Sequence, residues 1–166
     1  MAGIFSFRCS SCGAIHEGAP SFAFNSPLGY DNLSANEKEA AQLSSDFCIV
    51  GDNRYIRVCL EIPIVGIEAP FIWGVWVSLS EKNFQRYAET FEAPVESDEY
   101  FGWFCNRLPF YPDTKHLGSL VHPRSNNLRP YLELEPTDHQ LSIDFHNGLT
   151  VQRAQEIAEV AMHNNG

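Results

Sequence analysis

The chain has 166 residues, of which 44% are hydrophobic, 13% aromatic and 19% charged, with 11 Lys and Arg against 21 Asp and Glu. This composition excludes a disordered tail, a coiled coil and a collagen-like repeat, and the length predicts one domain that buries roughly two-thirds of its unfolded surface without disulfides. The formal net charge of −10 argues against a nucleic-acid partner, because that affinity comes mostly from Lys and Arg neutralising phosphates.

Three further features bear on location. The longest apolar stretch, residues 69–79, contains Pro70 and Gly74 and is too short for a membrane span. The start of the chain shows no positive residue followed by an apolar segment, so no signal peptide is expected. Five unevenly spaced cysteines fit a reducing compartment better than a disulfide scaffold. We therefore expect a cytoplasmic protein with no membrane partner.

The first half of the chain predicts a short helix followed by strands. Residues 7–18 are rich in turn formers, residues 20–30 suit a connecting loop, and Ser34 with Glu37 forms a capping box for a helix that ends near Leu43. Residues 47–50 and 55–62 indicate two strands separated by a turn, and the second alternates strictly between apolar and polar residues. Residues 71–78 are apolar on both faces, which indicates a central strand.

The next segment predicts one helix and three more strands. The helix begins near Ser80, ends before Pro94 and carries an apolar stripe of Phe84, Tyr87, Ala88 and Phe91. Strands are expected at 100–106, 117–122 and 131–134, with an ordered loop at 108–114. Pro123 and Pro130 place the last two strands at sheet edges.

Two helices are expected at the end of the chain. Thr137 or Asp138 caps the first, which runs through His146 and ends at Gly148. Thr150 caps the second, whose inward residues would be Val151, Ala154, Ile157, Ala158 and Ala161. The fold class is therefore α+β: a mostly antiparallel sheet with packed helices, a C-terminal helical hairpin and an N-terminal zinc-knuckle-like segment. We expect residues 1–24 to form this segment and residues 25–166 the α+β domain, the two acting as one structural unit.

The sharpest local motif is Cys9-x-x-Cys12-Gly13. Two thiolates at this spacing can bind one tetrahedral zinc at about 2.3 Å, and a glycine after the second cysteine allows a tight turn. A redox dithiol is the alternative, but such a motif normally opens a helix in a βαβ unit, whereas here it lies near the start of the chain. Two unconnected cysteines in a loose tail are the third interpretation.

The remaining zinc ligands are predicted from position. His16 follows Cys12 by four residues, and Cys48 lies at the start of a strand that can pass beside the knuckle. We predict a structural Zn²⁺ held by Cys9, Cys12, His16 and Cys48. Cys59 and Cys105 are interpreted as small buried hydrophobic residues.

A second candidate site lies in the C-terminal third. Loops there carry residues that could converge as a general acid–base or metal site, namely His116, His122, His139, Asp113 and Asp138. Helix capping, turns and surface polarity explain the same residues without catalysis. Cys105 and His122 could also act as nucleophile and base, although burial of the cysteine in the core is the simpler interpretation.

Aromatic residues are more numerous than one thin core readily hides. The relevant group is Trp73, Trp76, Phe101, Trp103, Phe104, Phe110 and Tyr111. Most are expected in the core, and some are expected to line a groove, since Tyr and Trp are enriched at binding surfaces. Arg107, Arg124 and Arg129 could then meet a carboxylate or a partner's acidic edge, unless each pairs with one of the chain's own acids.

The chain resembles the bacterial domain-of-unknown-function family numbered 2199. The residues that carry the resemblance span nearly the whole chain and include Phe7-x-Cys9-x-x-Cys12-Gly13-x-x-His16-Glu17-Gly18, Leu43-Ser44-Ser45-Asp46-x-Cys48, Phe71-x-Trp73-Gly74-Val75-Trp76, Phe101-Gly102-Trp103-x-x-Asn106, Tyr111-Pro112-Asp113-Thr114 and Glu135-Pro136-Thr137-Asp138-His139. The resemblance implies no particular activity. It does imply that Cys9, Cys12 and His16 belong to one shared motif.

Two functions follow from the sequence. The first is a non-enzymatic cytoplasmic module in which a structural zinc site holds the chain start and an aromatic face binds an unknown protein or small-molecule ligand. The second is a hydrolase-like enzyme that uses the histidine-containing C-terminal loops. The number of protein ligands separates them, because four protein ligands make a zinc site structural while an open position allows chemistry.

Overall fold

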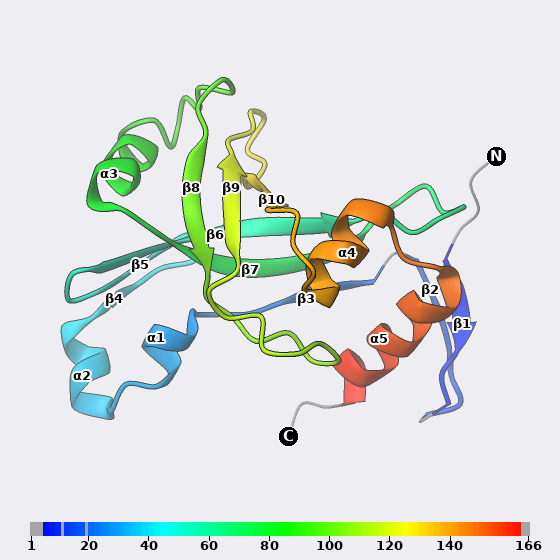
Figure 1. Ribbon diagram of the computed structural model, residues 1–166. Coiled ribbons are helices and arrows are strands. Elements are labelled where there is room, and N and C mark those ends of the chain that lie inside the picture. The colour runs from blue at the N-terminus through cyan, green and yellow to red at the C-terminus, as the bar shows by residue number, and fades with distance from the viewer. Residues whose placement is uncertain (1–4, 11, 19, 164–166) are drawn as a thin grey trace.

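The computed structural model describes residues 5–10, 12–18 and 20–163 (Figure 1). Strands form most of the body, and the helices lie around them. In chain order the elements are β1 Ser6–Arg8, β2 Ile15–Glu17, β3 Ser21–Ala23, α1 Leu28–Asp31, α2 Ala35–Ala40, β4 Gln42–Leu43, β5 Phe47–Val50, β6 Asn53–Ile62, β7 Phe71–Leu79, α3 Glu81–Glu89, β8 Tyr100–Phe104, β9 Gly118–His122, β10 Tyr131–Leu134, α4 Gln140–Asn147 and α5 Val151–His163.

The main sheet closes on itself. Strands β6, β7, β8, β9 and β10 pair in that order through antiparallel ladders, and β10 returns to β6 through a parallel pairing of Tyr131 with Cys59. Strand β3 adds to β7, while β5 and β4 extend from β6. The predicted α+β class is confirmed, but the sheet is a closed five-stranded barrel, which the sequence did not indicate.

The alternation along β6 produces the core. Ile56, Val58, Leu60 and Ile62 are fully buried, and each lies opposite an apolar residue of β7. Burial of each such side chain stabilises the fold by roughly 1.5–3 kcal/mol. The same core cluster contains the buried apolar residues of α3, α4 and α5, so these helices pack against the core that the strands form. Strand β7 pairs with three strands, which confirms its predicted central position.

The positions of Pro123 and Pro130 correct the predicted sheet edges. Both β9 and β10 have paired neighbours on each side, so neither is an edge strand. Pro123 follows β9 and Pro130 precedes β10, outside the paired residues, where the missing N–H is not needed. Pro130 contributes only its carbonyl oxygen, which accepts a hydrogen bond from the backbone N–H of Cys59 at 2.9 Å.

Helix termini match the sequence only in part. The capping box of Ser34 and Glu37 is present, and Ser80 caps α3. The predicted N-cap of α4, Thr137 or Asp138, is wrong: the N-cap is His139, whose Nδ1 accepts from the backbone N–H of Leu141 at 3.0 Å.

Among the described residues, no helix combines the length and the apolar character needed to cross a membrane.

For α3 and α5, the sequence predicts more inward-facing residues than the structure buries. Ala88 and Phe91 are exposed although Phe84 and Tyr87 are buried, and Val151 at the start of α5 is exposed. The remaining inward residues of α5 are buried as predicted.

Backbone pairing fixes the start of α5. Three residues separate α4 from α5, and Gly148 ends α4 with φ of +85°, a region that favours glycine. Leu149 donates its N–H to Pro63 at 2.7 Å and accepts from Val65 at 2.8 Å. The segment after β6 therefore determines where the last helix begins.

A buried amide supports the junction between β7 and β8. The Asn106 side chain, 1% exposed, accepts from the backbone N–H of Trp76 at 2.8 Å and donates to the carbonyl of Ser26 at 3.0 Å. The Asn106 carbonyl accepts from the Thr114 hydroxyl at 2.6 Å. Asn106 therefore continues the contact between the strands beyond their ladder.

We predict that Asn106→Ala lowers the free energy of unfolding by about 2–4 kcal/mol, because a buried N–H and a buried carbonyl lose their partners. Urea denaturation followed by circular dichroism measures this. The exposed Asn36→Ala in α2 is the control and should change stability by less than about 0.5 kcal/mol. Equal stability of the two variants would contradict the role given to Asn106.

Candidate metal centre

The N-terminal hairpin forms a tight loop that carries two cysteines. Phe7 pairs with His16 and Arg8 with Ile15, so residues 9–14 make the connection. The backbone N–H of Cys9 donates to Ala14 at 2.8 Å, and that of Gly13 donates to Cys9 at 2.9 Å. Gly13 has φ of +72°, which an L-residue adopts at a cost. The glycine thus allows the turn that brings Cys12 back toward Cys9.

Strand alternation places the hairpin ligands on one side. Phe7 and Cys9 are two residues apart and share a face, and His16 lies opposite Phe7 with its ring 5.4 Å from the phenyl ring. Phe7 and Cys9 are 7% and 1% exposed and belong to the main core. The inward face of the hairpin therefore packs against the domain, while Cys12 remains exposed in the loop.

Helix α5 supplies the surface on which this loop rests. Ser10 donates its N–H and its hydroxyl to the two carboxylate oxygens of Glu159, at 2.9 and 2.8 Å. Both hydrogen bonds lower the pKa of Glu159, and the bond from the backbone N–H has the larger effect. At 100° per residue, His163 lies about 40° around the helix from Glu159, so the two share one flank. The loop therefore reaches His163 at the end of α5.

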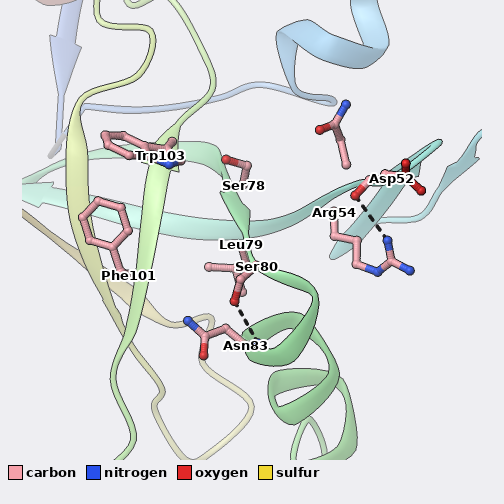
Figure 2. A pocket seen from close by; sticks show the side chains of 9 residues that line it. Asp52, Arg54, Ser78, Leu79, Ser80, Asn83, Phe101 and Trp103 are labelled. Atoms are coloured by element: carbon pink, nitrogen blue, oxygen red, sulfur yellow. Dashed lines mark hydrogen bonds between the residues drawn. The ribbon is translucent and has the colours of Figure 1, made fainter.

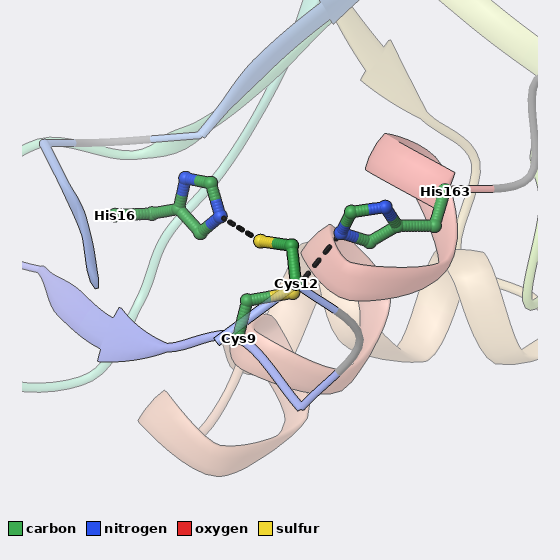
Figure 3. Close-up of side chains that lie close together, drawn as sticks. All are labelled: Cys9, Cys12, His16 and His163. Carbon is green, nitrogen blue, oxygen red and sulfur yellow. Dashed lines mark hydrogen bonds between the residues drawn. The ribbon is translucent and has the colours of Figure 1, made fainter. Parts of the chain in front are cut away.

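Four ligand atoms converge at this point (Figure 3). Cys9 Sγ lies 3.0 Å from His163 Nε2, and Cys12 Sγ lies 3.5 Å from His16 Nε2. All four ligand atoms lie within 4.8 Å of one another. A tetrahedral zinc with bonds of about 2.0–2.3 Å separates its ligand atoms by roughly 3.3–3.8 Å. Small side-chain movements would suffice, so the cluster could hold a metal ion.

The structure brings together three of the four predicted zinc ligands. Cys48 is not among them: it is fully buried in a second apolar cluster with Tyr55, Trp76 and Cys105. Burial raises the pKa of Cys48 to about 11, which disfavours the thiolate that a metal needs. The fourth side chain at the cluster is His163. All five cysteines lie within the described residues, and none forms a disulfide.

Of the three candidate histidines, His122 and His139 have structural partners, as does His146, while His116 is exposed. His122 contacts Glu133 at 2.8 Å and stacks on Tyr131, His139 caps α4, and the ring of His146 lies 2.7 Å from the carbonyl of Leu134. Within the described ranges, no group of three or more His, Cys, Asp or Glu outside the terminal cluster has the arrangement needed to hold a metal. These contacts match the interpretation of the residues as caps and pairs.

Cys105 and His122 do not form a nucleophile–base pair. In the β8–β9 ladder Tyr100 lies opposite Val121 and Trp103 opposite Gly118, so Cys105 and His122 lie toward opposite ends of it. The Cys105 thiol donates to the carbonyl of Trp103 at 3.2 Å, and burial raises its pKa.

The three candidate arginines pair with acids of the chain itself. The nearest nitrogen–oxygen distance is 3.2 Å between Arg107 and Asp113, 2.9 Å between Arg124 and Glu61, and 2.9 Å between Arg129 and Asp46. This arrangement matches the alternative interpretation, in which each arginine forms an ion pair with a carboxylate of the chain itself.

The fold and the cluster define an α+β protein with a Cys₂His₂ group that joins its N-terminal hairpin to its last helix. The family profile of DUF2199, described as an uncharacterized protein conserved in bacteria, matches residues 8–149, and the chain belongs to this family. No curated protein and no solved structure gives a match. The matched range includes Cys9, Cys12 and His16 and ends before His163.

Single substitutions test whether His163 or Cys48 is the fourth ligand. We predict that His163→Asn lowers zinc affinity by roughly tenfold or more, whereas Cys48→Ala leaves it unchanged. Competition with a chromophoric chelator measures the affinity. His116→Asn, at an exposed histidine outside the cluster, is the matched control. Loss of zinc in Cys48→Ala with full retention in His163→Asn would contradict the assignment.

Proposed function

We propose that the chain is a non-enzymatic binding protein whose two ends are joined by a structural zinc ion. The observation that carries this proposal is the convergence of Cys9, Cys12, His16 and His163 within 4.8 Å. Three of these residues come from the N-terminal hairpin and one from the end of α5. A metal at this point would connect segments that the chain order places far apart.

The number of ligands supports a structural role. Two thiolates and two imidazoles complete a tetrahedral shell, so no coordination position remains for water or substrate. Sulfur and imidazole together favour zinc over hard cations such as magnesium and calcium. A reducing compartment such as the cytoplasm would keep Cys9 and Cys12 as thiols able to bind the ion.

The packing supports one structural unit. Phe5, Phe7 and Cys9 belong to the same core cluster as the buried residues of α5. Zinc that binds only the folded state would add about 2.7 kcal/mol of stability at a free concentration 100 times its dissociation constant. On this account residues 1–24 and 25–166 fold together, and the ion stabilises the contact between them.

The exposed aromatic residues support a binding role for the body of the protein. Phe101, Trp103 and Phe110 are 38%, 48% and 40% exposed, whereas Trp73 and Trp76 are buried. Exposed tryptophan is typical of surfaces that bind a partner or ligand. His122 and His139 are held in an ion pair and a helix cap, and no second acidic or basic group gathers with them at a metal-binding spacing among the described residues, which favours binding over catalysis.

The zinc proposal is tested with Cys12→Ser, since Cys12 is exposed and its replacement leaves the core intact. We predict about one zinc per chain in protein purified without added metal, and less in Cys12→Ser. The variant should melt about 5–10 °C lower, because it loses the stabilisation by zinc. Elemental analysis and calorimetry give the two quantities.

Cys59→Ser, at a half-buried cysteine outside the cluster, is the matched control and should keep its zinc. Treatment of the wild type with a strong chelator should reproduce the lower melting temperature of Cys12→Ser. Fully folded wild type with a zinc-to-protein ratio near zero, and no response to chelator, would refute the proposal.

A further inference from the structure

The outer face of β8, β9 and β10 carries exposed aromatic rings. Phe101 and Trp103 are 38% and 48% exposed and meet edge to face with ring centroids 4.8 Å apart. Tyr131 on β10 is 40% exposed. Neighbouring exposed rings of this size are uncommon on a surface that contacts only water, and they typically mark an interaction site.

The register places carboxylates across from the two rings of β8. Phe101 lies opposite Leu120 of β9, which lies opposite Glu133 of β10. Trp103 lies opposite Gly118, whose carbonyl accepts from the N–H of Glu135 at 3.0 Å. Two rows therefore run across the face, each with an aromatic residue on β8 at one end and an acidic residue at the other, and the backbones of the two lie two strand spacings, about 10 Å, apart.

Gly118 allows the acid of the second row to lie over β9. A Cβ at this position would collide with the carboxylate of Glu135, which therefore lies over the glycine backbone, toward Trp103. The strand between ring and acid has no side chain there. The Glu135 carboxylate therefore fills the space over Gly118, on the strand next to the one that carries the exposed Trp103.

A pocket of about 430 Å³ lies on the other side of the two rings (Figure 2). Phe101 and Trp103 line it together with residues at the end of β7 and the start of α3 and β6. Arg54 is already engaged there, since it donates to the carbonyl of Asp52 at 3.3 Å and pairs with Glu81 at 3.8 Å. On this side the rings therefore face one carboxylate, one guanidinium and several uncharged polar groups, whereas the acids of the two rows lie on the other side.

The exposed aromatic rings and the nearby carboxylates favour a cationic ligand. The faces of aromatic rings attract ammonium and guanidinium groups, and nearby carboxylates add to that attraction. The same face already holds one guanidinium, that of Arg124, 5.6 Å from the centroid of the Tyr131 ring. A second copy of the chain brings the same net charge of −10 and is repelled, whereas a basic partner is attracted.

We propose that an extended basic segment of a partner protein docks on the outer face of β8–β10, with an Arg or Lys side chain between Trp103 and Glu135. This proposal rests on the proposed function in treating the protein as a binding module, but it does not depend on the zinc ion. The ligand is defined by its chemistry: alternate cationic side chains on an extended backbone.

Trp103 provides the measurement, because the other two tryptophans, Trp73 and Trp76, are only 2% and 0% exposed. The probe is a seven-residue peptide of alternating serine and arginine, titrated while tryptophan fluorescence is recorded. We expect a saturable change in emission. The same peptide with citrulline, the neutral near-isostere, in place of arginine should bind at least about fivefold more weakly, since it lacks the charge.

Two substitutions locate the binding. Phe101→Ser and Glu135→Gln should each weaken the arginine peptide by about two- to fivefold, because each removes one contact to the cation. Glu156→Gln, at an exposed acid of α5, makes the same charge change away from the face and should leave binding unchanged. The melting temperature of each variant shows whether it remains folded.

The proposal is overturned by any of four results: no saturable signal, equal binding of the citrulline peptide, equal binding by Glu135→Gln and Glu156→Gln, or a Trp103 signal that changes with protein concentration alone and so reports a second copy. Zinc content is measured on the same samples. If folded, zinc-loaded protein does not bind the peptide, this inference alone is overturned. If zinc-free protein binds the peptide, the structural zinc is refuted and the docking face is supported.

Discussion

Cys9 and His163 are separated by 154 positions in the chain, and their side chains lie 3.0 Å apart. The N-terminal hairpin and the last helix meet at this contact, and both must be in place before a metal can bind. Helix α5 is set by the pairing of Leu149 with the segment after β6, and the hairpin is set by Phe5 and Phe7 in the core. Packing therefore brings the ligands close, and a bound ion would then oppose separation of the two ends.

The closed sheet explains how one small domain supports both features. Closure buries one side of the five strands together with the faces of three helices, and it leaves the other side of β8, β9 and β10 available. The four candidate metal ligands come from the hairpin and α5, whereas the aromatic rings lie on β8 and the acids lie in β10 and directly after it. The two features share no strand or helix, although both are anchored in the same core cluster.

Local signals in the sequence predicted local structure well. The period-two pattern of β6, the apolar run of β7 and the Ser34 capping box each depend on residues close in the chain, and the structure contains all three. The edge positions assigned to β9 and β10 are wrong because a proline beside a strand does not reveal which strands pair across the sheet. Closure through Tyr131 and Cys59 joins residues 72 positions apart by their numbering, and no local pattern encodes it.

The candidate metal site shows the same difference between what local spacing predicts and what only the tertiary fold determines. The cluster contains Cys9, Cys12 and His16, whose spacing within one hairpin is itself the signal in the sequence. A strand start can pass beside a terminal knuckle, which is the basis of the Cys48 prediction, but the structure places Cys48 in the second apolar cluster. His163 lies on the flank of α5 that carries Glu159, away from the apolar stripe, and only the tertiary fold shows that the hairpin loop reaches that flank.

X-ray absorption at the zinc edge tests the central claim most directly, because it reports the atoms bound to the ion. The account predicts two sulfur ligands at about 2.3 Å and two imidazole nitrogens at about 2.0–2.1 Å, with no water in the shell. A shell of three or four sulfurs would show that another cysteine displaces a histidine. A shell that contains water, or one without sulfur, would contradict the closed Cys₂His₂ site on which the structural role of the ion depends.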